Sequence, residues 1–487
     1  MAHVEIVDQT TRDGPQSLWG MRIRAGTVAD IAPWLGRAGY RTIEVIGGSF
    51  FSVLLRYLRE DPIEAYSLIR RSLRGSTLRG GVRPSSSGRY GLSPYSILDF
   101  YNQFMARLGE DEVWVYDCLY NMPEMRRRAQ SVYDTGCTVI LAVMYGLSPV
   151  HTDEWFAERV REMVSWGLAK AIYIEDAPGI LTPDRTATLI PAIVKAAGEL
   201  PVELHCHNTT GLAPLNYLVG VEHGVQRIHT CSRPMANGVS LPSTEMMLVN
   251  LQAAGHTHDI DESTLAPVAE RLEAIARAEG HPVGEVYEYD ARVYDHQLPG
   301  GMTGTFKAQL VQHGMQDRWG AVLEEIPRVR EELGYPVSAT PFSQHIGTQA
   351  VLNVVSDERY AVTSDELVLY MLGAYGEPPI PVQQDVKDRV LSTQRGRELA
   401  GWTRPEQTLD QVRAEYGGKG CSDEDLFRLH FAPPADVEAT RAAGPIRTSY
   451  RFPAPSLTEL TTLALAASRA RRLRLRTPEL SFDVSRP

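Results

Sequence analysis

The sequence lacks several features that would assign it to a common class. No apolar run approaches the roughly 18 residues of a membrane-spanning helix. The N-terminal stretch MAHVEIVDQTTRDG does not have the basic-then-apolar order of a secretory signal. The net charge of −11 at pH 7 leaves no basic excess of the kind that a broad nucleic-acid interface needs. We therefore expect neither a membrane span nor a nucleic-acid partner.

Cysteine is also scarce, and its spacing contains no paired motif. The chain has five cysteines in 487 residues, an odd number, and none of them forms a C-x-x-C pair. Such usage favours a reduced, cytoplasmic protein over a disulfide-bonded one. Four of the five lie in or beside strand-like runs, where a thiol is typically a small buried apolar group; the five are Cys118, Cys137, Cys206, Cys231 and Cys421.

What the chain does have, from residue 4 to about 255, is a repeated pair of elements. An apolar run of strand length is followed each time by a segment with apolar residues at helical spacing. Strands that are apolar on both faces indicate a parallel sheet covered by helices, and about eight units predict a closed (β/α)8 barrel. The predicted strands are VEIVDQT, TIEVIGG, TLRGGV, EVWVYDC, TVILAVMY, AIYIED, VELHCH and RIHTCS.

The pattern changes after the predicted barrel, so three regions are expected. Residues 1–300 form the barrel, and residues 301–435 read as a helix-rich domain broken by proline and glycine. Residues 436–487 read as a linker followed by a small helix and strands. The fold class is therefore α/β, a TIM barrel with a helix-rich C-terminal domain.

The strand ends carry the polar residues that are candidates for chemistry. His205 and His207 alternate along one strand and so point to the same side, toward the barrel mouth. Two imidazoles and one carboxylate are suitable ligands for a divalent metal, and Asp13, after the first strand, is the natural carboxylate. Next to it, Arg12 can bind a carboxylate or enolate oxygen, and Gln16 can donate a neutral hydrogen bond. The competing interpretation of this turn is a simple helix cap.

These motifs resemble those of one family. The stretches DQTTRDGPQSLWGMRIR, EVIGGSFF, TLRGG, IEDAPGILTP, LHCHNTTGLAPLNYLVGVEHGV and LGYPVSATPFSQHIGTQAVLNV are similar to the carboxyltransferase component of biotin-dependent enzymes that act on 2-oxo acids. Pyruvate carboxylase, the oxaloacetate decarboxylase alpha subunit and the pyruvate-side subunit of transcarboxylase belong to it, within the DRE-TIM metallolyases. The resemblance spans roughly residues 4–430.

The resemblance implies a role for each matching residue. Asp13, His205 and His207 would bind the metal, with Arg12 and Gln16 beside the substrate oxygen. The domain over the barrel mouth would supply a threonine that shuttles a proton to biotin. Arg79, in TLRGG, would hold the substrate carboxylate, and Tyr90 would match a pocket tyrosine if four extra residues are allowed. The threonine is Thr340, and the metal is Zn, Mn or Co.

The family's biotin is not encoded here, because the chain has no M-K-M biotinylation motif. The resemblance therefore implies a separate biotin carrier protein, a small 2-oxo acid as substrate, and a homodimer or larger assembly. The tail SLTELTTLALAASRARRLRLRTPELSFDVS faintly resembles the segment that precedes the biotinyl domain of carrier proteins, and its alternative interpretation is a surface appendage.

Glu175 is the main departure from the family, which has there a lysine that becomes carboxylated and binds the metal. A glutamate is already a carboxylate, but its side chain is shorter. It either binds the metal directly, or orients a ligand or water beside it, or forms an ion pair unrelated to metal. Pro15 and Asn208 also differ from the usual pattern.

Three functions therefore stay open at this point. The first is carboxyl transfer or decarboxylation of a 2-oxo acid with carrier-bound biotin. The second is a biotin-independent lyase or Claisen-type enzyme on the same barrel, which the departures favour. The third is a non-catalytic subunit of a carboxylase complex.

Overall fold

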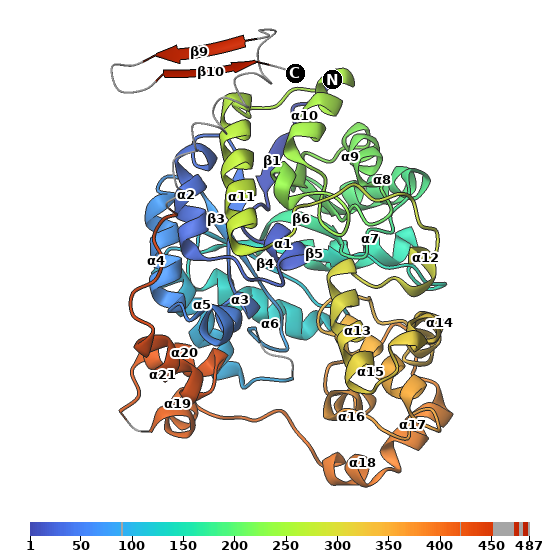
Figure 1. Cartoon of the computed structure of the whole chain (residues 1–487). Coiled ribbons are helices and arrows are strands. Elements are labelled where there is room, and N and C mark those ends of the chain that lie inside the picture. The colour runs from blue at the N-terminus through green and yellow to red at the C-terminus, as the bar shows by residue number, and fades with distance from the viewer. Residues whose placement is uncertain (89–90, 419, 451–471, 477–480, 486–487) are drawn as a thin grey trace. The chain divides into compact units, whose positions relative to one another are not determined.

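A computed structural model of the chain describes residues 1–88, 91–418, 420–450, 472–476 and 481–485 (Figure 1). It divides into two compact units, Met1–Thr448 and Ser449–Pro487. In the second unit, β9 (Arg472–Arg476) pairs antiparallel with β10 (Ser481–Ser485). The predicted helix of this tail lies outside the described residues.

The first unit is built on a closed barrel of eight parallel strands, as predicted. Neighbouring strands follow chain order, and β8 closes the barrel by pairing with β1. All eight predicted strands are present. Their bounds are β1 Glu5–Asp8, β2 Thr42–Glu44, β3 Leu78–Val82, β4 Glu112–Val115, β5 Thr138–Met144, β6 Ala169–Asp176, β7 Val202–Cys206 and β8 Arg227–Thr230.

Helices connect the strands and cover the outside of the barrel. Several begin at a side-chain cap, because a threonine or serine oxygen accepts a hydrogen bond from the first turn: Thr152 caps α7, Thr182 caps α8 and Ser243 caps α10. The helices of this part are α1 Asp13–Leu18, α2 Ala25–Leu35, α3 Ser49–Val53, α4 Pro62–Ser72, α5 Tyr95–Leu108, α6 Met122–Tyr133, α7 Asp153–Ser165, α8 Pro183–Ala197, α9 Ala213–Glu222, α10 Thr244–Ala253 and α11 Leu265–Glu279.

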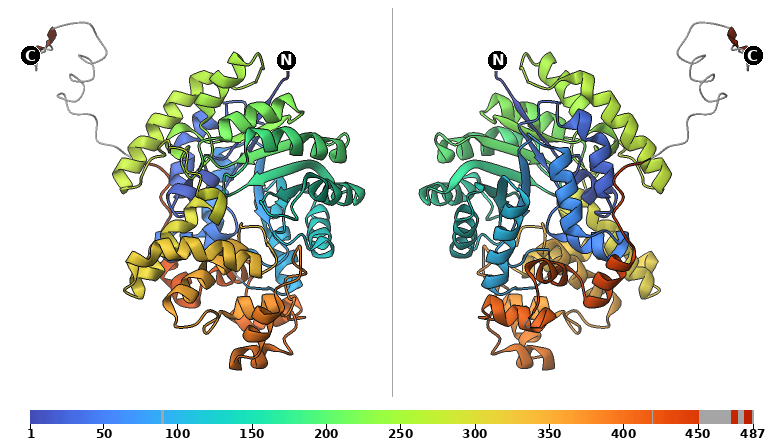
Figure 2. Two further views of the ribbon diagram at one scale, coloured as in Figure 1. Left: turned by 90° about the vertical axis from the view of Figure 1, so that its right-hand side faces the viewer. Right: turned by 90° about the vertical axis from the view of Figure 1, so that its left-hand side faces the viewer.

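The helices after residue 290 lie at one end of the barrel in two groups, joined by an extended segment (Figures 1 and 2). The first group is α12 Val293–His296, α13 Thr303–Gln312, α14 Trp319–Glu332, α15 Phe342–Val355, α16 Asp365–Met371, α17 Gln384–Leu391 and α18 Gln394–Leu399. The second group is α19 Leu409–Gly417, α20 Asp423–Phe431 and α21 Pro434–Ala442. The barrel and both groups lie in the unit Met1–Thr448. The predicted domain boundaries at residues 300 and 435 stay predictions.

Aromatic packing holds the second group to the barrel. Phe427 of α20 stacks on Phe104 of α5 with ring centroids 4.4 Å apart, and Phe431 lies 5.2 Å from Phe51 of α3. These rings are buried, so the contacts combine apolar burial with favourable ring geometry. The helices that end the chain's first unit are therefore part of its core.

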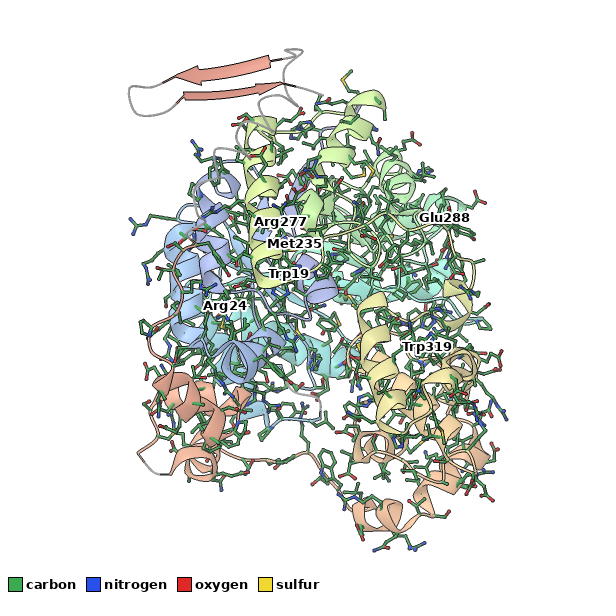
Figure 3. The ribbon with its side chains drawn as sticks, in the orientation of Figure 1. Trp19, Arg24, Met235, Arg277, Glu288 and Trp319 are labelled. Atoms are coloured by element: carbon green, nitrogen blue, oxygen red, sulfur yellow. The ribbon has the colours of Figure 1, made fainter. Side chains whose placement is uncertain are left out.

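Trp19, which Figure 3 labels, holds the segment after α11. Its ring stacks on His281 at 4.6 Å, and its indole nitrogen donates to the Pro282 carbonyl at 2.8 Å.

Among the described residues, no helix combines the length and apolar character needed to cross a membrane.

Candidate functional site

A cavity of about 520 Å³ opens at the C-terminal ends of the barrel strands. Part of its wall comes from loops of the barrel, and part from Pro299–Met302 and from the segment before α15. Four predicted site residues on the barrel side and one on the helical side line it together: Arg12, Gln16, Glu175, His207 and Thr340. Residues from the barrel and from the helical part that follows it therefore face one space.

The turn between β1 and α1 places Arg12 and Asp13 beneath this cavity. The backbone N–H groups of Arg12, Asp13 and Gly14 all donate to the Gln9 carbonyl, which makes the turn tight. A side chain at Gly14 would meet Met235 Cβ at 2.6 Å, so the close approach of the β8 loop requires glycine. Ser17 then donates to Asp13 Oδ1 at 2.9 Å and fixes this carboxylate.

Asp13, His205 and His207 form a buried group whose ligand atoms lie within 4.8 Å of one another. His205 Nε2 is 3.7 Å from Asp13 Oδ2, and His207 Nε2 is 3.4 Å from Asp13 Oδ1. Burial lowers the pKa of His205 well below its ordinary value, and the nearby His207 acts in the same direction. Burial acts to raise the pKa of Asp13, but His207 and Arg12 outweigh it, so the net shift is downward.

The donor set fits a divalent metal. His205 Nε2 is buried without a hydrogen-bond partner although it faces Asp13, which is the arrangement of a nitrogen that awaits a ligand. His207 Nδ1 is 2.7 Å from the Val239 carbonyl, so it donates there and leaves the Nε2 lone pair toward Asp13. Two neutral imidazoles and one carboxylate leave further coordination positions for substrate.

Arg12 is the cation closest to this group. It pairs with Asp13, its Nε lies 3.3 Å from Glu44 Oε1, and its guanidinium lies 5.2 Å from the centre of the Trp114 ring. Burial acts to lower the pKa of Arg12, but the carboxylates of Asp13, Glu44 and Glu175 raise it overall. The guanidinium is therefore charged and held in one orientation.

Glu175 is the penultimate residue of β6 and lines the cavity, outside the Asp13–His205–His207 group. Its Oε2 is buried without a hydrogen-bond partner. Burial raises the pKa of Glu175 to about 8, with the carboxylate of Asp13 contributing and Arg12 opposing. Direct binding to a metal by Glu175 stays a prediction.

Its neighbour Asp176 has a different, structural role. Asp176 accepts hydrogen bonds from the backbone N–H groups of Gly179, Ile180 and Leu181 at 2.7 to 3.1 Å. It therefore shapes the loop from β6 to α8. Of the two adjacent carboxylates that end this strand, only Glu175 lines the cavity.

The structure does not place Arg79, which we predicted to hold the substrate carboxylate, at the cavity. Arg79 lies on β3 opposite Glu112, is fully buried, and binds two carboxylates, with Nη2 2.8 Å from Glu112 Oε2 and Nη1 2.5 Å from Glu203 Oε2. Four of its five N–H donors are used on these two carboxylates, and Arg79 does not line the cavity.

Arg83, which we did not predict, lines the cavity in its place. Its Nη2 lies 3.0 Å from Ser86 Oγ, and its Nη1 lies 3.4 Å from Tyr116 Oη. The sequence held a signal for it. Arg83 comes four residues after Arg79, which equals the four extra residues that matching Tyr90 required. Tyr90 itself lies outside the described residues.

Thr340 lies where the helical part meets the cavity, immediately before Pro341 and α15. Its carbonyl accepts a hydrogen bond from Cys118 Sγ at 3.4 Å, which ties it to the loop after β4. Gln344, in the first turn of α15, lines the same cavity and was not predicted. Thr340 and Gln344 thus share one cavity with barrel residues, and the covering of the barrel mouth by the C-terminal helices stays a prediction.

Known proteins resemble this chain along most of its length. A family model described as a conserved carboxylase domain matches residues 293–435, and one described as HMGL-like matches residues 106–272. A pyruvate carboxylase subunit of Methanocaldococcus jannaschii is 34% identical over 447 residues, which cover 90% of this chain and 78% of the relative. The 2-oxoglutarate carboxylase large subunit of Hydrogenobacter thermophilus is 30% identical over 465 residues, covering 94% and 71%.

A solved structure shares the fold. The carboxyl transferase domain of Rhizobium etli pyruvate carboxylase, determined with pyruvate and biocytin, superposes with a TM-score of 0.81 and 24% identity. The match covers 91% of this chain and 78% of that one. It therefore extends beyond the barrel into the helices that follow.

Proposed function

We propose, since this chain belongs to the carboxyltransferase family of the pyruvate carboxylases, that it moves a carboxyl group between carrier-bound biotin and a small 2-oxo acid. The observation that carries the proposal is the single cavity that brings Arg12, Gln16, Arg83 and Thr340 together above the Asp13–His205–His207 group.

The cationic side chains support binding of the 2-oxo acid. Arg83 can hold the substrate carboxylate in a bidentate way. Gln16 can donate to the 2-oxo oxygen without adding charge. Arg12 is held by Asp13 and Glu44, so its guanidinium is preorganised to stabilise the negative charge that develops on that oxygen.

Thr340 supports the proton transfer that the reaction needs. When carboxybiotin releases CO2, its ureido nitrogen gains a proton, which the hydroxyl of Thr340 can give. The same hydroxyl takes a proton from the carbon next to the 2-oxo group, and the resulting enolate bonds to CO2. Atoms and charge balance, because the 2-oxo acid loses one proton and gains one carboxylate while biotin does the reverse.

The residues that would hold a metal are Asp13, His205 and His207. Glu175 would be either a fourth ligand or a neighbour that orients a ligand or water. A divalent metal there would act as a Lewis acid on the 2-oxo oxygen. Zn, Mn and Co all suit imidazole and carboxylate ligands.

The carrier is proposed to be a separate biotinylated protein, because the chain has no M-K-M motif. The relatives' names, which describe them as individual subunits, support an enzyme assembled from several chains. The homodimer that we expect from the family is tested by sedimentation of the purified protein.

The deciding experiment incubates the protein with a biotinylated carrier domain and ¹⁴C-labelled carboxybiotin or oxaloacetate, across several 2-oxo acids of different chain length. The ¹⁴C-labelled carboxyl group should move only when both the biotinylated carrier and a 2-oxo acid are present, and avidin should stop the transfer. A panel with no carrier-dependent transfer or decarboxylation would refute the proposal.

One observation favours a second candidate function. The cavity has Glu175 where the family has a lysine, and this carboxyl group is buried beside the metal group. A biotin-independent lyase or Claisen-type enzyme on this barrel would turn over free substrate and ignore avidin, so the same assay separates the two functions.

A further inference from the structure

Two buried side chains lie behind the metal group and continue it toward the closed end of the barrel. His205 Nδ1 is 3.2 Å from His229 Nδ1, and His229 Nε2 is 3.1 Å from Glu203 Oε2. All three side chains are fully buried, His205 and Glu203 on β7 and His229 on β8. Neither His229 nor Glu203 lines the cavity.

The direction of the outer hydrogen bond follows from the partners of Glu203. This carboxylate accepts two hydrogen bonds from Arg79, at 2.5 and 3.1 Å, and one from Arg227 at 2.8 Å. A carboxylate between two guanidinium groups is ionised and can only accept. His229 Nε2 must therefore carry a proton and donate it to Glu203.

The direction of the inner hydrogen bond follows from Gln9. Its amide nitrogen lies 2.7 Å from Glu44 Oε2 and 3.0 Å from His229 Nδ1. Because the Glu44 carboxylate fixes which end of the amide is nitrogen, Gln9 donates to His229 Nδ1 as well. That nitrogen is an acceptor, so the proton between the two imidazoles belongs to His205 Nδ1.

We infer that Glu203 and His229 are positioning residues that hold His205 in the tautomer whose Nε2 lone pair faces the metal site. The inference rests on the metal site proposed above. With Nδ1 protonated, a neutral His205 has its lone pair on Nε2, the buried atom without a partner that lies 3.7 Å from Asp13.

The second histidine ligand is supported differently, which makes the inference testable. His207 Nδ1 donates to the Val239 backbone carbonyl, at 2.7 Å, which no substitution removes. His205 depends on a side chain instead. His229 itself is no candidate ligand, because its two nitrogens face Glu203 and His205 and not Asp13.

The experiment titrates Zn²⁺ or Co²⁺ into the metal-free full chain by calorimetry and records the visible spectrum of the Co²⁺-loaded protein. We expect His229→Leu to weaken metal binding about 10- to 100-fold, the range for partners of metal-bound histidine. His229→Asn should recover part of the affinity, because its Oδ1 can accept from His205 Nδ1.

The matched control is His151→Leu, another buried histidine, which contacts Ser148 at 2.7 Å after β5 and does not line the cavity. It should leave affinity and spectrum unchanged. A His229→Leu protein that folds and binds metal like the parent, with the same spectrum, would overturn the inference. If the parent binds no metal at all, the proposed metal site fails instead.

A measurement on the unaltered protein guards against variants that do not fold. Nitrogen NMR of the ¹⁵N-histidine-labelled, metal-free chain should show His205 protonated at Nδ1 and not at Nε2. The opposite tautomer would refute the inference without any substitution.

Discussion

Arg404 donates hydrogen bonds to the backbone carbonyls of Pro84, at 2.6 Å, and Ser85, at 3.2 Å. Its Nη1 also pairs with Glu124 at 2.8 Å. Arg404 comes from the extended segment between α18 and α19, whereas the two carbonyls belong to the loop after β3, next to Arg83. The segment that links the two helix groups therefore holds the loop after β3 in place. This loop carries Arg83, which lines the cavity.

Replacing Arg404 should therefore affect substrate binding from outside the cavity. We expect Arg404→Ala to raise KM for the 2-oxo acid about tenfold, because losing charged hydrogen bonds worth roughly 1.5 kcal/mol loosens the Arg83 loop. Steady-state kinetics measure this. Arg395→Ala is the control, since its pairs with Asp365 and Glu398 are half-exposed and should contribute little. An unchanged KM in Arg404→Ala would contradict the role.

Replacing Arg83 should affect substrate binding, whereas replacing Arg79 should affect stability. Arg83→Lys should raise KM for the 2-oxo acid at least tenfold with little loss of stability, since lysine cannot form a bidentate pair. Arg79→Met should instead lower the free energy of unfolding by about 3–5 kcal/mol, because it removes four charged hydrogen bonds from the buried carboxylates of Glu112 and Glu203. Denaturant unfolding and kinetics on both variants separate the roles.

Glu175 can be tested by its metal content. We expect Glu175→Gln to keep stoichiometric metal while losing most of the turnover, because its carboxylate lies outside the Asp13–His205–His207 group. His207→Ala is the comparison that should lose the metal. Elemental analysis of both proteins checks this, and metal lost equally from both would mean that Glu175 is a direct ligand.

Glu110 should make the free energy of unfolding depend on pH. Burial raises the pKa of Glu110 from 4.5 to about 8, and Glu44 contributes. Between these values the folded state keeps a proton that the unfolded chain has lost, so the free energy of unfolding falls as pH rises, by at most about 1.4 kcal/mol per pH unit. The loss is complete above pH 8 and absent below pH 4.5.

Glu110→Gln isolates this effect, since glutamine mimics the protonated acid. Denaturant unfolding of parent and variant between pH 5 and 9 should show a shallower decline for the variant. Parallel curves would mean that Glu110 does not hold the proton.

The barrel could be predicted from the sequence because its signals are local and repeated. Eight apolar runs alternate with amphipathic segments, and each strand formed where its run lies. The histidine pair was equally readable, because residues two apart on a strand share a face. Thr340 needed the family resemblance, since nothing local in ATPFSQ indicates that it faces a cavity.

The sequence could not place the two arginines near β3 correctly, because Arg79 and Arg83 differ only in depth along the barrel. Arg79 lies level with Glu112 at the start of β4, whereas Arg83 follows the end of β3. That difference depends on strand register and on Glu203, which is 124 residues away. Likewise, no pattern in RIHTCS shows that His229 contacts His205.

The ion pair between Arg79 and Glu203 also bears on how the barrel can fold. It joins β3 to β7 across the interior, so each half-barrel carries one of two opposite charges. A free half with strands β1 to β4 would keep Arg79 beside Glu112, and one with β5 to β8 would keep Glu203 beside Arg227 and His229. Each half would still lose the two hydrogen bonds that Arg79 donates to Glu203 across the barrel, at a cost of roughly 1.5–3 kcal/mol for each bond. Fragments cut between β4 and β5 should therefore be unstable alone and recover structure only when mixed.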